Sequence, residues 1–137
     1  MEDVKINVKI KLSALWAARM LSALQADVVV FLQPGMLEEM IAGTTELQIT
    51  IELISVMAII FMVPIFMSFL SLTLQDKANR WANLSIGIFF AGFDLIFLIL
   101  VLFVWQTFAY EKILYVVYLV FTSLVFWHAW KWPKQEA

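Results

Sequence analysis

Four predominantly apolar stretches constrain the fold of this chain more than any other feature of its sequence. They cover residues 12–32, 49–74, 84–105 and 113–130. A helix of about 20 apolar residues crosses the hydrocarbon core of a bilayer, which is about 30 Å thick. Helices satisfy their own backbone polar groups, as lipid requires. The sequence therefore predicts an all-α membrane protein, an antiparallel bundle of four transmembrane helices that forms one domain over residues 1–137.

Composition narrows the chemistry that such a bundle can carry. Hydrophobic residues make up 64% of the chain and charged residues 15%, against about 45–50% and about 25% in soluble domains. The net charge of -2 argues against nucleic acid as a partner, and the absence of cysteine excludes thiolate metal sites. His128 is the only histidine and is expected at the inner interface. We expect no metal, no cofactor and no catalytic residues, because no nucleophile and base are paired by a motif.

Basic residues predict the orientation of the bundle. Lys and Arg in short flanking segments favour the cytoplasmic side of a membrane. Seven of them fall on one face: Lys5, Lys9, Lys11, Lys77, Arg80, Lys131 and Lys134. The other face carries Lys112 and the acidic residues Glu38, Glu39 and Glu46. Both termini are therefore expected to be cytoplasmic. The first apolar stretch is expected to stay in the protein as a span and not to be a cleaved signal peptide, because Arg19 interrupts the apolar region that a signal peptide requires.

The segments between the apolar stretches are short. Residues 4–11 alternate apolar and polar, which favours an extended arm whose lysines meet anionic headgroups or which pairs with the arm of another subunit. Residues 77–83 are interpreted as a loop. After Pro34 and Gly35, apolar residues at helical spacing over 36–41 predict a short helix on the outer surface.

Four ionisable residues lie inside the predicted spans: Arg19, Asp27, Glu52 and Asp94. Each costs roughly 2.5–3.5 kcal/mol at a helix centre, so each is a functional candidate. Arg19 and Asp94 are about 10 and 15 Å from the inner edge at 1.5 Å per residue, and are expected to pair. The pair either orients two helices, or Asp94 releases Arg19 in order to take up a proton or to bind a substrate.

Asp27 and Glu52 are expected at a common depth near the outer ends of the first and second spans. Adjacent helices would bring the two carboxylates together, where they would share a proton or hold a cation. The alternatives are that both side chains reach the outer headgroups or water, or that they make structural hydrogen bonds.

Small and hydroxylated residues indicate where helices pack. A ridge of small residues follows one side of the first span: Ala14, Ala18, Ser22 and Ala26. Gly87 and Ala91 form a second small pair, expected to face the first span together with Asp94. Pro64 is expected to kink the second span and free the carbonyl of Ile60.

The fourth span carries hydroxyl groups along one side. Tyr115, Tyr118 and Thr122 recur at helical spacing and predict a hydrogen-bonding face toward the interior of the bundle.

Several short segments combine tryptophan, charged and turn-forming residues in a distinctive order. The segments are residues 8–16, 77–83 and 127–133. Two further combinations are Asp27 followed by Pro34 and Gly35, and Pro64 followed by residues 69–72. Over nearly the whole chain, these segments resemble a bacterial family of small four-span integral membrane proteins of unknown function. The resemblance implies a location in the bacterial inner membrane and implies that Asp27 and Arg80 are family features. It implies no activity.

The sequence predicts function only in outline. The leading hypothesis is an oligomeric transporter or channel for a cation, a proton or a small solute, with Asp27, Glu52, Arg19 and Asp94 as the residues involved. The alternative is a non-catalytic partner or assembly subunit of a membrane complex, and a lipid- or quinone-directed enzyme comes third. The expected partners are the lipid bilayer, further copies of the chain and another membrane protein.

Overall fold

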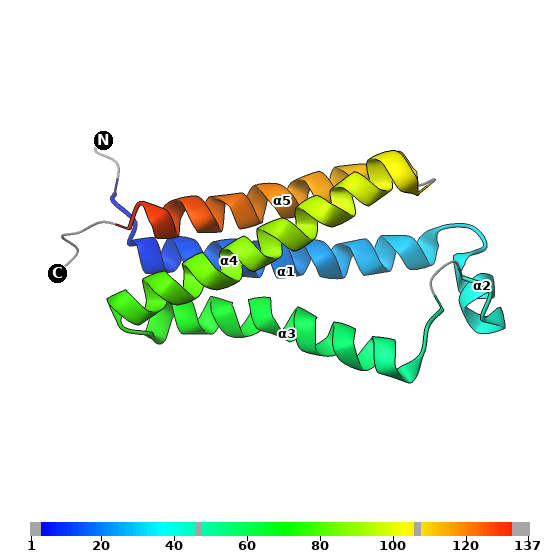
Figure 1. Cartoon of the computed structure of the whole chain (residues 1–137), viewed down its shortest axis with the longest axis horizontal. Coiled ribbons are helices and arrows are strands. Elements are labelled where there is room, and N and C mark those ends of the chain that lie inside the picture. The colour runs from blue at the N-terminus through cyan, green and yellow to red at the C-terminus, as the bar shows by residue number, and fades with distance from the viewer. Residues whose placement is uncertain (1–3, 46–47, 106–107, 133–137) are drawn as a thin grey trace.

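The chain is helical throughout its regular structure. The computed structural model describes residues 4–45, 48–105 and 108–132, and contains no β-strand in those ranges. The helices are α1 (Val8–Leu32), α2 (Met36–Ala42), α3 (Ile51–Thr73), α4 (Asp76–Ile99) with the π-helical turn η1 (Leu100–Val104), and α5 (Ala109–Trp130) (Figure 1). Four of these helices, α1, α3, α4 with η1, and α5, are long and apolar enough to cross a membrane. The predicted all-α membrane bundle is confirmed.

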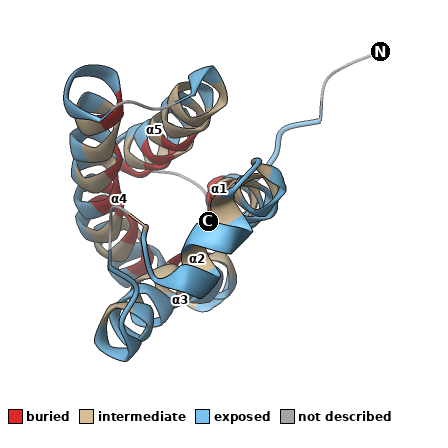
Figure 2. Ribbon diagram, turned by 90° about the vertical axis from the view of Figure 1, so that its right-hand side faces the viewer, coloured by how far each residue is buried: buried red, intermediate tan, exposed pale blue. Residues whose placement is uncertain are grey.

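Helices α1 and α5 each pack against two of the other long helices. Helix α1 packs against α3 on one side and α5 on the other, while α4 runs along α5. The short connection at Leu74 and Gln75 holds α3 and α4 together at one end, and the two helices then diverge (Figure 1). Buried residues collect where α1, α4 and α5 face one another (Figure 2). The first and last described residues lie at the same end of the bundle, which is called the inner end below (Figure 1).

Helix α1 begins at Val8, four residues before the predicted start of the first span. The side-chain oxygen of Asn7 accepts a hydrogen bond from the backbone N–H of Lys9, which caps the helix. Val8 and Leu12 are one turn apart and both buried. The predicted extended arm is therefore wrong for residues 8–11, because burial at helical spacing outweighs the alternating pattern. Within the predicted arm, residues 4–7 are the part that is not helical.

Helix α4 begins at Asp76, so the predicted loop over residues 77–83 is also wrong. Asn79 and Asn83 lie one turn apart on this segment, and both are fully buried. Polar residues of this kind are typical of loops, but here their side chains are hydrogen-bonded inside the bundle. The helix that carries them therefore extends past the apolar stretch.

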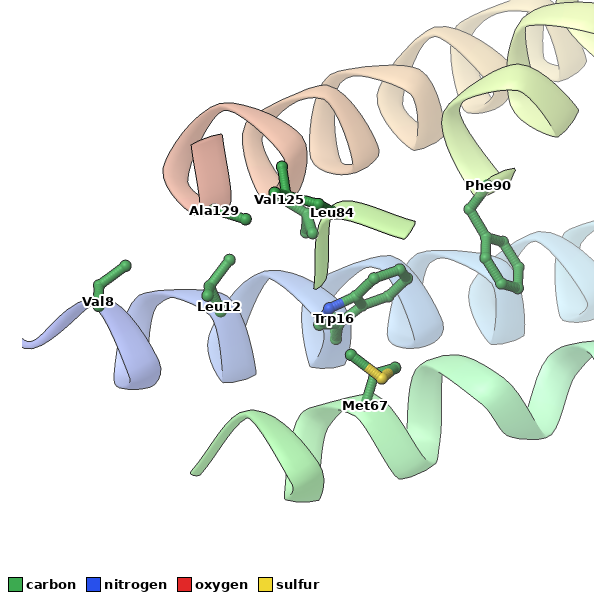
Figure 3. Close-up of a cluster of buried hydrophobic side chains, with 8 residues drawn as sticks. All are labelled: Val8, Leu12, Trp16, Met67, Leu84, Phe90, Val125 and Ala129. Carbon is green, nitrogen blue, oxygen red and sulfur yellow. The ribbon is translucent and has the colours of Figure 1, made fainter. Parts of the chain in front are cut away.

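The core lies toward the inner end, where four helices contribute to one apolar cluster (Figure 3). Its members are Val8, Leu12, Trp16, Met67, Leu84, Phe90, Val125 and Ala129. Trp16 is fully buried, and the edge of its ring meets Phe90 with 5.7 Å between the centroids. Most other large apolar side chains are exposed on the outside of the bundle, where a bilayer would cover them.

Gly87 marks the close approach of α4 to α5. A Cβ atom at this position would lie 3.2 Å from Cγ1 of Val125. The predicted orientation of the Gly87 and Ala91 pair toward the first span is thus wrong for Gly87, which packs against α5. The reason is that α1 and α4 are bridged by long side chains rather than by close backbones.

The other packing residues fall in different environments. In the α1 ridge, Ala14 is exposed, whereas Ala18, Ser22 and Ala26 are half-buried. Pro64 is buried within a helix that continues to Thr73, and the predicted kink stays a prediction.

Candidate functional site

The predicted pairing of Arg19 with Asp94 is confirmed. Nε of Arg19 lies 3.1 Å from Oδ2 of Asp94, and Nη2 donates to Oδ1. The guanidinium group therefore holds both carboxylate oxygens, a geometry that fixes position as well as charge. Only 5% of the arginine side chain and 1% of the aspartate side chain are exposed. Two full charges thus lie in the interior, where each needs its partner.

Residues of α4 and α5 complete the surroundings of this ion pair. Thr122 Oγ1 lies 3.2 Å from Asp94 Oδ2. The Arg19 guanidinium lies over the rings of Phe90 and Tyr118, at 4.7 and 5.4 Å from their centroids, where the ring faces attract a cation. Arg19, Phe90, Asp94, Tyr118 and Thr122 are called the ion-pair cluster below.

The predicted hydrogen-bonding face of α5 is confirmed for Tyr118 and Thr122. The Tyr118 hydroxyl lies 3.4 Å from the backbone carbonyl of Ser22, so α5 also bonds to α1 directly. Tyr115, by contrast, stacks on Phe97 with 5.9 Å between the ring centroids. This face therefore joins α5 both to α1 and to α4.

A second group of buried polar side chains lies closer to the inner end, and sequence reasoning missed it. Nε1 of Trp16 donates to Oδ1 of Asn83 at 2.8 Å, and Nδ2 of Asn83 lies 2.7 Å from Oδ1 of Asn79. Nδ2 of Asn79 in turn donates to the carbonyl of Ser71 at 2.7 Å. Trp16, Ser71, Asn79 and Asn83 are called the asparagine network. The spacing of the two asparagines, one helical turn apart, was the available signal.

Long basic side chains tie the helix ends together at the inner end. Nζ of Lys9 lies 2.8 Å from Asp76 and 3.0 Å from the carbonyl of Leu74, where α3 ends. Nε and Nη2 of Arg80 donate to the carbonyls of Ala129 and Trp130, at 3.1 and 3.2 Å. Carbonyls at a helix end have no partner within the helix, so both contacts supply donors to such groups at the ends of α3 and α5.

Asp27 and Glu52 are both exposed, and the structure records no interaction between them. Asp27 lies in the last part of α1, five residues before the helix ends at Leu32. Glu52 is in the first turn of α3, and this end of α3 lies apart from the outer end of α1 (Figure 1). The shared carboxylate site stays a prediction. Glu46 and Lys134, which entered the orientation argument, lie outside the described residues.

The buried polar groups are fully used within one chain. In the ranges that the structure describes, every buried side-chain nitrogen and oxygen atom has a hydrogen-bonding partner. Neither the ion-pair cluster nor the asparagine network therefore leaves a buried side-chain nitrogen or oxygen atom without a partner.

The four apolar helices and their buried charges define a class, the polytopic α-helical membrane proteins. Comparison with protein-family models, curated proteins and solved structures finds no match to this chain. The resemblance to a bacterial four-span family stays a prediction.

Proposed function

We propose that this chain is a non-enzymatic subunit of an assembly in the bacterial inner membrane, and that its intramembrane charges hold its own helices in place. The observation that supports this most is the ion-pair cluster. Asp94 is bonded to Arg19 and Thr122, and Arg19 is also covered by two aromatic rings. A pair with this many internal contacts orients three helices without help from a ligand.

The proposed assembly role is supported by the apolar surface that the bundle exposes. Because Arg19 and Asp94 are buried and paired with each other, most of the surface left for interaction within the membrane is the exposed apolar exterior. Helix α3 contributes most to it: only Pro64, Met67 and Ser71 of its 23 residues are buried, and all three lie in its second half. The partner is a further copy of the chain or another membrane protein.

Transport of a proton or cation is the second candidate, and one observation favours it. Asp27 is exposed on α1, about two helical turns beyond Arg19 toward the outer end of the bundle. An ionisable side chain thus lies between the outer end of α1 and the buried pair. In this alternative, Asp94 would exchange Arg19 for the transported ion.

One variant separates the two functions. Arg19→Met with Asp94→Leu replaces the ion pair by apolar side chains of similar size, an exchange that buried pairs often tolerate. We expect wild type and double variant to migrate at the same size, larger than one chain, when native membranes are solubilised gently. We also expect both proteins to give the same proton and potassium flux in proteoliposomes as empty vesicles.

Two results would overturn the assembly proposal. Migration of the wild-type protein at the size of a single chain would show that it forms no assembly. Flux through wild-type protein that the folded double variant lacks would establish transport through the ion pair.

A further inference from the structure

A basic cavity lies at the inner end of the bundle, away from both buried polar clusters. Arg80 on α4 lines it together with Trp130, Lys131 and Trp132 at the end of α5, and its volume is about 400 Å³. Two cations and two indole rings thus surround one open cavity at the point where an apolar span ends.

The Arg80 side chain is held in position independently of any ligand. Its bonds to the carbonyls of Ala129 and Trp130 fix the guanidinium plane against the last turn of α5. A guanidinium group has five N–H donors, so further donors are left to point at an anion. Arginine held in this way is suited to a phosphate group, which accepts two parallel hydrogen bonds.

Lys131 supplies the second charge. Its ammonium lies 4.5 Å from the centroid of the Trp127 ring, and its side chain is exposed. In the described ranges the ion pairs are Lys9 with Asp76 and Arg19 with Asp94, so neither Arg80 nor Lys131 is neutralised by a carboxylate there. The cavity therefore carries an excess of positive charge.

We propose that this cavity binds the phosphate of an anionic phospholipid headgroup. A lipid fits better than a soluble anion because the cavity adjoins exposed apolar surface on which acyl chains can lie. Trp81 and Trp130 are 56% and 60% exposed there, and tryptophan prefers the boundary between headgroups and hydrocarbon. Basic pockets between helices on the cytoplasmic side are suited to such headgroups. This inference does not depend on the assembly proposal.

The test uses native mass spectrometry of the full-length protein in detergent with defined lipids. Phosphatidylglycerol and phosphatidylcholine with the same acyl chains are compared, for wild type, Lys131→Gln and Lys77→Gln. Lys77 is the matched control, because it is also an exposed lysine at the inner end but does not line the cavity. We expect wild type to retain phosphatidylglycerol preferentially, Lys131→Gln to bind it about fivefold more weakly, and Lys77→Gln to be unchanged.

Two further measurements, competition with inorganic phosphate and comparison of Arg80 variants, identify the source of the phosphate and the role of Arg80. We expect inorganic phosphate at millimolar concentration to displace little of the lipid, and Arg80→Lys to retain more lipid than Arg80→Gln, with thermal unfolding as the check on folding. Complete displacement by inorganic phosphate would show a free-anion site. Equal losses in the Lys77 and Lys131 variants would show diffuse surface attraction. Either result would overturn the proposal.

Discussion

Individual buried side chains decide how the helices of this bundle are positioned. Arg19 and Asp94 could be paired from the sequence because both interrupt apolar stretches and their depths differ by less than the reach of an arginine. Trp16, Asn79 and Asn83 could not be connected in this way. Their contacts depend on α4 beginning at Asp76, and a polar segment after a span resembles a loop.

Removing one member of the asparagine network should destabilise the bundle. Asn83→Ala deletes the acceptor of Trp16 and the amide that contacts Asn79. Leaving buried donors and acceptors unpaired costs about 1–3 kcal/mol, so we expect a loss of that size in the free energy of unfolding in mixed detergent micelles. Ser85→Ala is the control, since Ser85 is exposed and bonds only within its own helix. Equal effects of the two substitutions would refute this role for the network.

At the scale of elements, the existence of each helix could be predicted, whereas its beginning was predicted well only for α3. The second span, 49–74, matches α3 within two residues at each end, while the fourth span ends with α5 at Trp130 but α5 begins four residues earlier than predicted. Helices α1 and α4 both begin earlier than their apolar stretches, because side chains of the extra turns are buried or hydrogen-bonded. Apolar content measures the part of a helix that lipid can cover, whereas contacts with other helices decide where the helix begins.

The close approach of α4 to α5 at Gly87 can be tested by substitution, with Gly92 in the same helix as the control. Gly87→Val introduces a branched side chain at a position where even a Cβ atom would lie 3.2 Å from Cγ1 of Val125, whereas a Cβ atom at Gly92 would meet nothing within 4 Å. Overpacking costs about 1–3 kcal/mol, so we expect a loss of that size for Gly87→Val. For Gly92→Val we expect a change within about 0.5 kcal/mol. Unfolding in mixed micelles measures both, and similar values would mean that the close approach is relieved at no cost.

For the whole molecule, the sequence predicts an even number of spans, while the order α3, α1, α5, α4 around the bundle needed the structure. Short connections predict only that consecutive spans run in opposite directions. Helix α1 lies between α3 and α5 because it packs on two sides. Ser13 of α1 bonds to Ser68 of α3 on one side, and Ser22 of α1 accepts a bond from Tyr118 of α5 on the other. The sequence placed Tyr118 on a hydrogen-bonding face, but nothing in it indicated that the partners would be Ser22 for Tyr118 and Ser68 for Ser13.

Orientation in the membrane can be measured directly, because the chain has no cysteine of its own. Lys77→Cys and Glu38→Cys place single thiols at exposed positions near opposite ends of the bundle. With both termini cytoplasmic, a membrane-impermeant maleimide should label Glu38→Cys in spheroplasts and should label Lys77→Cys only after permeabilisation. The reverse pattern would show that the bundle is inserted the other way round.

The claim that Arg19 and Asp94 serve each other inside the bundle, and not a ligand, is tested most directly by a double-mutant cycle. The free energy of unfolding in mixed micelles is measured for wild type, Arg19→Met, Asp94→Leu and the two together. Each single substitution leaves an unpaired buried charge and should cost about 3–5 kcal/mol, whereas the double variant should lie within about 1 kcal/mol of wild type. A double variant destabilised by the sum of the two single effects would contradict the account.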